Sequence, residues 1–148
     1  MAFKFRLQSV LNHRLHLEDK AKAELGLCLQ AQKQCEERVI WLREEMLRIR
    51  RNMTAQEQAG MDASSFILNN EYVTLLRLQA LREEARLPLL IAQSNQARSA
   101  LVEAMQNRKA LDLLMERDKK EYEKALAAME RNLLDEVAVG AYARGKIS

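Results

Sequence analysis

The sequence predicts an all-α protein in which two long helices fold back on each other as an antiparallel coiled-coil hairpin. Residues 4–58 contain one Gly and no Pro, and residues 66–139 contain one Pro and no Gly. Both blocks are rich in Leu, Ala, Glu, Gln, Lys and Arg, which lose little side-chain freedom in a helix. Charged residues make up 30% of the chain and aromatic residues only 5%, a composition typical of coiled coils. A single cluster of turn-forming residues, GMDASS at 60–65, separates the two blocks.

The first helix is expected over about residues 3–58, because an apolar stripe runs along it with alternating spacings of four and three residues. This heptad pattern places one seam of a helix against a partner helix. Arg14, Glu18 and Gln32 interrupt the stripe, and polar seam residues of this kind fix register at a cost in stability. The fourteen positions are Leu7, Leu11, Arg14, Glu18, Ala21, Leu25, Cys28, Gln32, Cys35, Val39, Leu42, Met46, Ile49 and Met53.

The turn is expected over about residues 59–65. Gly60 suits the left-handed conformation that often ends a helix, and the side chain of Asp62 or Ser64 can accept hydrogen bonds from the first N–H groups of the next helix. So short a connection makes consecutive helices antiparallel neighbours. Residues 1–148 are therefore interpreted as one hairpin domain.

The second helix is expected over about residues 66–141, with a kink near Pro88 because proline removes one intrahelical hydrogen bond. Past residue 139 the pattern is lost and the end is expected to fray. Because this block is longer than the first, its part from about Asp118 on should lack a partner within the chain and present an apolar binding face. The predicted apolar stripe comprises Leu68, Tyr72, Leu75, Leu101, Met105, Met115, Tyr122, Leu126, Met129 and Leu133.

The sequence predicts no catalytic, cofactor-binding or metal site, so its function is expected to be contact with other macromolecules. His13 and His16 share a helix face, but no third metal ligand accompanies them. Asp135 and Glu136 are adjacent, so on a helix they diverge by about 100° and do not form an acid–base pair. There is no glycine-rich phosphate loop and no nucleophile motif.

The cysteine spacing and the hydropathy both indicate a cytosolic chain. Cys28 and Cys35 would lie about 10 Å apart along a helix, too far for a disulfide between them. Both fall on the apolar stripe, as small buried residues do in a reducing compartment. The longest apolar run, residues 87–92, is far short of the roughly 20 residues that span a bilayer, so no membrane-spanning segment is expected. The N-terminus lacks the apolar region of a secretory signal.

Two surface features are candidate contacts for a partner. Trp41 adjoins the seam residue Leu42 and should point away from the seam, either as an exposed anchor for a partner or lying along the flank of the hairpin. Arg48, Arg50 and Arg51 form the densest basic run, and the net charge is +3. A basic helical hairpin that binds nucleic acid is therefore an alternative, although no aromatic stacking residues accompany these arginines.

Both ends of the chain carry a specific resemblance. The opening reads FKFRLQSVL over residues 3–11, followed by Arg14. The C-terminal half contains KALDLLMER at 109–117, EY at 121–122 and DEVA at 135–138. Together with the two-helix plan, these segments resemble the FliJ family of the bacterial flagellar type III export apparatus.

The resemblance implies a non-enzymatic stalk, similar to the central γ subunit of rotary ATPases. It implies that the paired terminal ends enter the hexameric ring of the flagellar export ATPase and promote its assembly. It also implies that another part of the hairpin meets the cytoplasmic domain of the export-gate membrane protein, and that the chain helps to escort export chaperones. The chain would then be cytoplasmic and peripheral at the inner membrane, with no nucleic-acid partner.

Carried over by position, the resemblance assigns two groups of residues. The ATPase-facing end would comprise Arg6, Leu7, Leu11, Arg14, Asp135, Glu136 and Arg144. The gate-facing region would comprise Leu42, Ile49, Tyr72 and Leu76. Within the same class, the stalk protein of a virulence type III secretion system is an alternative.

Overall fold

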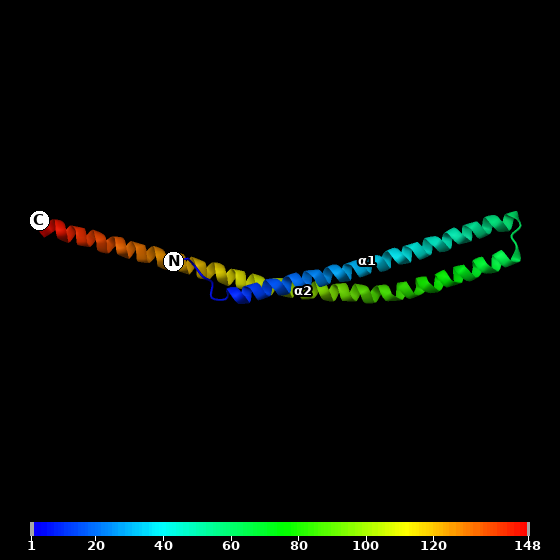
Figure 1. Ribbon diagram of the computed structural model, residues 1–148, viewed down its shortest axis with the longest axis horizontal. Helices are drawn as coiled ribbons and strands as arrows, with labels where there is room; N and C mark the ends of the chain where they lie inside the picture. The colour runs from blue at the N-terminus through cyan, green and yellow to red at the C-terminus, as the bar shows by residue number, and fades with distance from the viewer. Residues whose placement is uncertain (1, 148) are drawn as a thin grey trace. The chain divides into compact units, whose positions relative to one another are not determined.

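The computed structural model describes residues 2–147, and the side chains of residues 2–145. Two helices account for nearly all of it: α1 spans Gln8–Ala59 and α2 spans Ala63–Ile147. The described residues contain no strand. From the turn that joins them, the two helices run back along each other in opposite directions (Figure 1). The predicted all-α helical hairpin is therefore confirmed.

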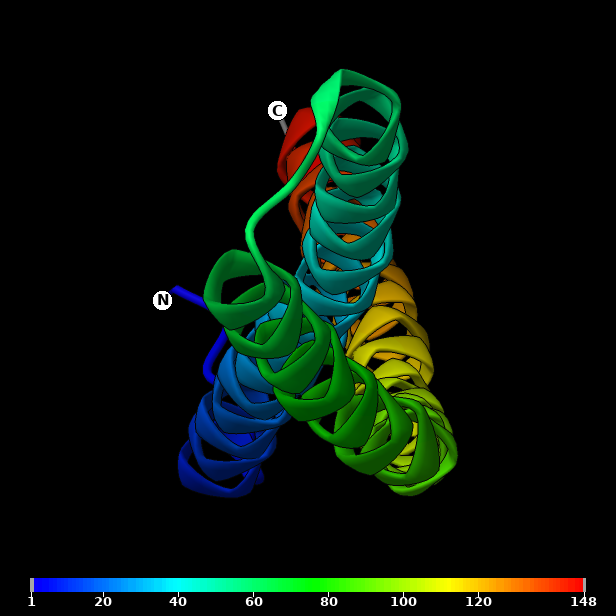
Figure 2. The ribbon, with the colours of Figure 1, turned by 90° about the vertical axis from the view of Figure 1, so that its right-hand side faces the viewer.

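The connection between the helices is shorter than the sequence suggested. Gly60 has a φ of 89°, the left-handed conformation predicted for it, and its N–H donates to the Glu57 carbonyl at 3.3 Å. The Phe66 N–H donates to the Asp62 carbonyl at 3.1 Å, which opens α2 directly after Asp62. Figure 2, viewed from the turn end, shows this connection passing from the end of α1 to the start of α2. Two serines expected in the turn belong instead to the first turn of α2, where unpartnered N–H groups suit them.

The outer ends of both helices differ from the expected bounds. α1 begins at Gln8 instead of near residue 3, and the Gln8 N–H donates to the Phe5 carbonyl at 3.1 Å in the turn before it. α2 continues past Pro88 without ending, as predicted. It also continues through Gly140 to Ile147, past the end expected near residue 141. A glycine inside a helix costs only about 1 kcal/mol, which does not by itself end a helix.

The contacts divide the chain into two compact units. One comprises Asp19–Val102, which contains the turn. The other comprises the residues up to Glu18 together with those from Glu103 on. In both units, the predicted stripe of α1 faces α2: all fourteen predicted positions are buried or partly buried. The heptad prediction for the first helix is therefore confirmed.

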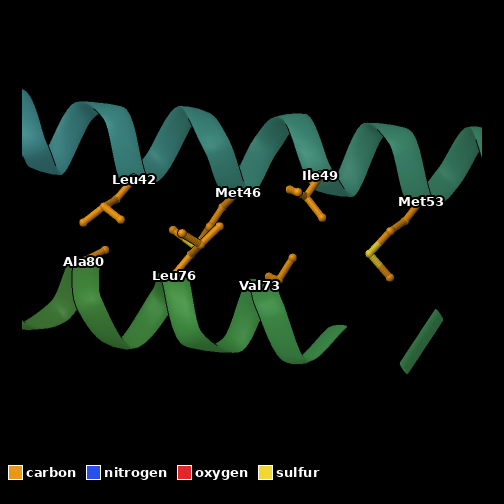
Figure 3. Packing of buried hydrophobic residues seen from close by; sticks show 7 residues of the cluster. All are labelled: Leu42, Met46, Ile49, Met53, Val73, Leu76 and Ala80. Carbon is orange, nitrogen blue, oxygen red and sulfur yellow. The ribbon is translucent and has the colours of Figure 1, made fainter. Parts of the chain in front are cut away.

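The largest apolar cluster lies in Asp19–Val102, near the turn. α1 contributes Leu42, Met46, Ile49 and Met53, and α2 contributes Val73, Leu76 and Ala80. These side chains point toward one another between the two helices (Figure 3). The Leu42 and Ala80 side chains are 0% exposed. Burial of this kind is the main stabilising contribution to a two-helix seam, because each Leu or Ile removed from water contributes about 1.5–3 kcal/mol.

The predicted stripe of the second helix is wrong at its start. Leu68, Tyr72 and Leu75 are 66%, 38% and 50% exposed. The buried positions of α2 in this unit instead belong to a regular heptad that runs through Val73, Leu76, Ala80, Glu83, Leu87, Leu90, Ser94, Ala97 and Leu101. Four of these residues are Ala, Ser or Glu. A stripe drawn through the large apolar residues of α2 therefore falls on the neighbouring, exposed face of the helix.

The middle of this seam is polar. Cys35 is 3% exposed, and its thiol donates to the backbone carbonyl and to the carboxylate of Glu83, both at 3.3 Å. Burial and then the Glu83 contacts raise the pKa of the Cys35 thiol, so this group stays protonated at neutral pH. An ion pair bridges the helices nearby, where Arg43 Nε donates to Glu84 at 2.8 Å. Both cysteines are free, and Cys28 is partly buried.

Candidate partner-binding surface

The segment ahead of α1 extends the packing of the helices at their outer end. Phe5 is 7% exposed and Leu11 is 4% exposed. The ring of Phe3 lies 5.5 Å from the ring of Tyr122, measured between centroids. The sequence predicts these phenylalanines inside the first helix, over about residues 3–58, whereas α1 begins at Gln8. Two bulky apolar residues that alternate just before a helix start are the signal that could have indicated a non-helical segment.

A charged cluster is built into the seam of the same unit. Arg108 donates through Nε to Glu18 at 2.5 Å and through Nη1 to Asp112 at 2.6 Å. The side chain of Glu18 is only 4% exposed, and that of Arg108 is 21% exposed. Hydrogen bonds to the two carboxylates raise the pKa of the Arg108 guanidinium, so it remains charged. Glu18, an interruption of the predicted stripe, is thus matched to a residue of the opposite charge.

Beyond Tyr122, α2 presents an apolar face to solvent. Leu126, Met129, Leu133 and Val137 are 40%, 69%, 61% and 57% exposed. At about 100° per residue these four side chains share one helix face, which we name the terminal stripe. Within residues 123–145, every residue is exposed except Ala128 and Gly140, which are partly buried. The predicted exposure of this face is confirmed, and an apolar patch of this kind is typical of an interaction site.

The residues predicted for the ATPase-facing end fall into two groups. Leu7, Leu11 and Arg14 are buried or partly buried, whereas the remaining members are exposed: Arg6, Asp135, Glu136 and Arg144. Phe3 reaches Tyr122, and Asp135 lies thirteen residues further along α2, about 20 Å at 1.5 Å per residue. Arg144 Nε donates to the Gly140 carbonyl at 3.3 Å. Leu7, Leu11 and Arg14 thus support the pairing of the helices, and of the C-terminal members Glu136 borders the terminal stripe.

Three of the four residues predicted for the gate-facing region are inside the seam. Leu42, Leu76 and Ile49 are 0%, 2% and 9% exposed. Tyr72 is 38% exposed and is the member that can present its side chain to a partner in this conformation. The assignment of this region to the export gate stays a prediction.

Trp41 lies outside the seam, as the sequence predicted. Its side chain is 47% exposed, and the Arg38 guanidinium carbon is 5.2 Å from the ring centroid. This cation–π contact covers part of the indole and holds the arginine beside it. A half-exposed tryptophan with a neighbouring cation can serve either as a partner anchor or as flank packing, and both interpretations of Trp41 stay open.

The described residues contain neither a metal-binding cluster nor a membrane-spanning helix. No group of three or more His, Cys, Asp or Glu side chains is arranged to hold a metal ion. In the same part of the chain, no helix combines the length and the hydropathy that crossing a membrane requires.

Comparison with protein families matches residues 3–146 to the family described as the flagellar FliJ protein. This chain belongs to the FliJ family. The match covers nearly the whole chain, so both helices and the terminal stripe fall within the family's extent. Neither the comparison with curated proteins nor that with solved structures gives a significant match.

FliJ-family membership assigns this chain to the flagellar type III export apparatus, with which it interacts. The family is of a non-enzymatic, stalk or chaperone type. The terminal stripe is an exposed apolar face outside the paired part of the hairpin.

Proposed function

We propose that this chain is the stalk that binds the hexameric flagellar export ATPase through the C-terminal end of α2 and promotes ring assembly. The observation that carries the proposal is the terminal stripe, in which four apolar side chains on one face are 40–69% exposed. Leaving such a face in water has a free-energy cost that a partner surface would remove. This end of α2 continues directly from the part of the helix that pairs with α1.

The other roles in the proposal are supported by features elsewhere. Contact with the cytoplasmic domain of the export gate would use exposed side chains of the unit that contains the turn, such as Tyr72 and Trp41, which are 38% and 47% exposed. Escort of export chaperones is proposed from family membership. The chain would act in the cytoplasm, at the inner-membrane face, through these protein contacts.

The alternatives have less support. The family description names the flagellum, which favours flagellar export over a virulence secretion system. All three arginines of the basic run are exposed, but Arg48 is engaged by Glu45 through two hydrogen bonds, which leaves two of them for nucleic-acid contacts. A titration of duplex DNA at rising salt tests this alternative, since phosphate contacts would make the affinity fall steeply.

The proposal is tested by adding the full chain to the purified cognate ATPase. We expect a higher rate of ATP hydrolysis and a larger fraction of rings, measured by a coupled assay and by sedimentation. A stalk that binds ring conformations unequally shifts their populations, which produces both effects. If the rate and the ring fraction are unchanged and no complex sediments, the proposal is wrong.

A double variant connects this activity to the terminal stripe. Leu126→Ala with Leu133→Ala should weaken binding to the ATPase at least tenfold, because burying each leucine contributes more than about 1.4 kcal/mol. Alanine preserves the helix. Val139→Ala is the matched control: Val139 is 68% exposed but projects roughly 130° from the centre of the stripe, and its variant should bind like the wild type. Equal loss in both variants would contradict the assignment of the stripe.

A further inference from the structure

The terminal stripe has acidic edges. On a helical projection at about 100° per residue, Glu123 and Glu130 border one side of the stripe and Glu136 borders the other. Glu130 and Glu136 also line a shallow surface hollow together with Leu126, Met129, Asn132 and Leu133. All three glutamates are exposed.

The opposite face of the same stretch carries the basic residues. Lys124 and Arg131 project roughly 150° and more from the centre of the stripe. Asp135 and Glu121 lie on this far face as well. The charges of residues 121–137 are therefore sorted: only carboxylates border the apolar stripe, and both cations are behind it.

This sorting restricts the surface that can cover the stripe. A partner that buries the stripe also removes water from Glu130 and Glu136, which is unfavourable unless cationic groups replace that water. Lysine or arginine at the rim of the partner's groove would do so, and would also speed association and exclude acidic surfaces.

We propose that the terminal stripe docks into an apolar groove of the export ATPase whose rim carries lysine or arginine side chains. This inference rests on the proposed function and adds the chemistry of the partner surface. A second copy of this chain is disfavoured as the occupant, because both edges of the stripe are acidic. In an antiparallel pairing the same edge of each copy meets, so Glu130 would face the Glu130 edge of the other copy and Glu136 would face its Glu136 edge.

The test compares two charge-neutralised full-length chains that differ only in the face they alter. E130Q/E136Q removes two carboxylates from the edges of the stripe, and E116Q/E121Q removes two exposed carboxylates that project about 95° and 125° from its centre. Affinity for the purified ATPase is measured by biolayer interferometry at low and physiological salt. Circular dichroism confirms that both variants keep their helix content.

We expect E130Q/E136Q to bind about tenfold more weakly at low salt, since each charge pair lost contributes up to roughly 1 kcal/mol. Its affinity should also depend less on salt, because fewer screened contacts remain. E116Q/E121Q should bind within about twofold of the wild type at physiological salt, where charges beyond roughly 8 Å are screened.

The other outcomes separate the two proposals. If the wild type binds the ATPase and E130Q/E136Q binds equally well or better, the basic-rimmed groove is wrong and the proposed function stands. If the wild type itself does not bind the ATPase, the proposed function fails. If sedimentation shows that the chain alone dimerises, and that E130Q/E136Q dimerises more strongly, the stripe is an interface between copies and the inference is overturned.

Discussion

Arg108→Met should clearly lower the free energy of unfolding, because it leaves the buried carboxylate of Glu18 without its counter-charge. Arg108 binds Glu18, whose side chain is 4% exposed, and it also binds Asp112. The arginine itself is 21% exposed, so water that reaches it makes the expected loss smaller than that for a fully buried pair. Urea unfolding followed by circular dichroism measures the change.

Arg43→Met is the matched control for this prediction. Arg43 also bridges the helices, to Glu84, but the two side chains are 46% and 36% exposed. An exposed pair contributes about 0–1 kcal/mol, so this variant should be nearly neutral. The double variant Glu18→Met/Arg108→Met should recover most of the stability, since apolar residues can replace a buried pair. Similar losses for Arg108→Met and Arg43→Met would contradict a buried charged cluster.

Leu42→Ala should also destabilise the protein by about 3 kcal/mol, through lost burial and the cavity left behind. Leu42 is 0% exposed and packs in the cluster that contains Met46, Leu76 and Ala80. Leu47→Ala makes the same chemical change on the same helix at a side chain that is 51% exposed. It should alter the stability by no more than about 0.5 kcal/mol.

The contrast between Leu42→Ala and Leu47→Ala tests which face of α1 pairs with α2. Urea midpoints for both variants, with unchanged slopes, would give the two free energies. Equal effects, or a larger effect for Leu47→Ala, would mean that another face of α1 is buried in solution and that the seam is misplaced.

The first helix could be predicted in detail because its buried face carries large apolar residues at regular spacing. Even its polar interruptions, such as Glu18, lie in the seam. The second helix could not, because Ala80, Ser94 and Ala97 occupy its buried positions. Small residues bring the helices close but contribute little to an apolar pattern. The exposed Leu75 contributed more to that pattern, although it faces solvent.

The candidate site was predictable in part for a similar reason. The longer second block implied an unpaired end, and the exposure of Leu133 agrees with that. The sorting of charges around the stripe follows from helix geometry. It indicates a binding face only when the paired and unpaired parts of α2 are known. The non-helical segment that packs Phe5 depends on contacts with α2, which local sequence does not specify.

Hydrogen–deuterium exchange of the full chain, with and without the cognate ATPase, tests most directly whether the terminal stripe is the partner-binding face. An unpaired helix opens readily, so its amides exchange fast until a partner covers it. We predict slower exchange across residues 122–140 on adding the ATPase, with exchange across residues 42–80 unchanged. Protection of residues 42–80 while residues 122–140 exchange as before would contradict the account.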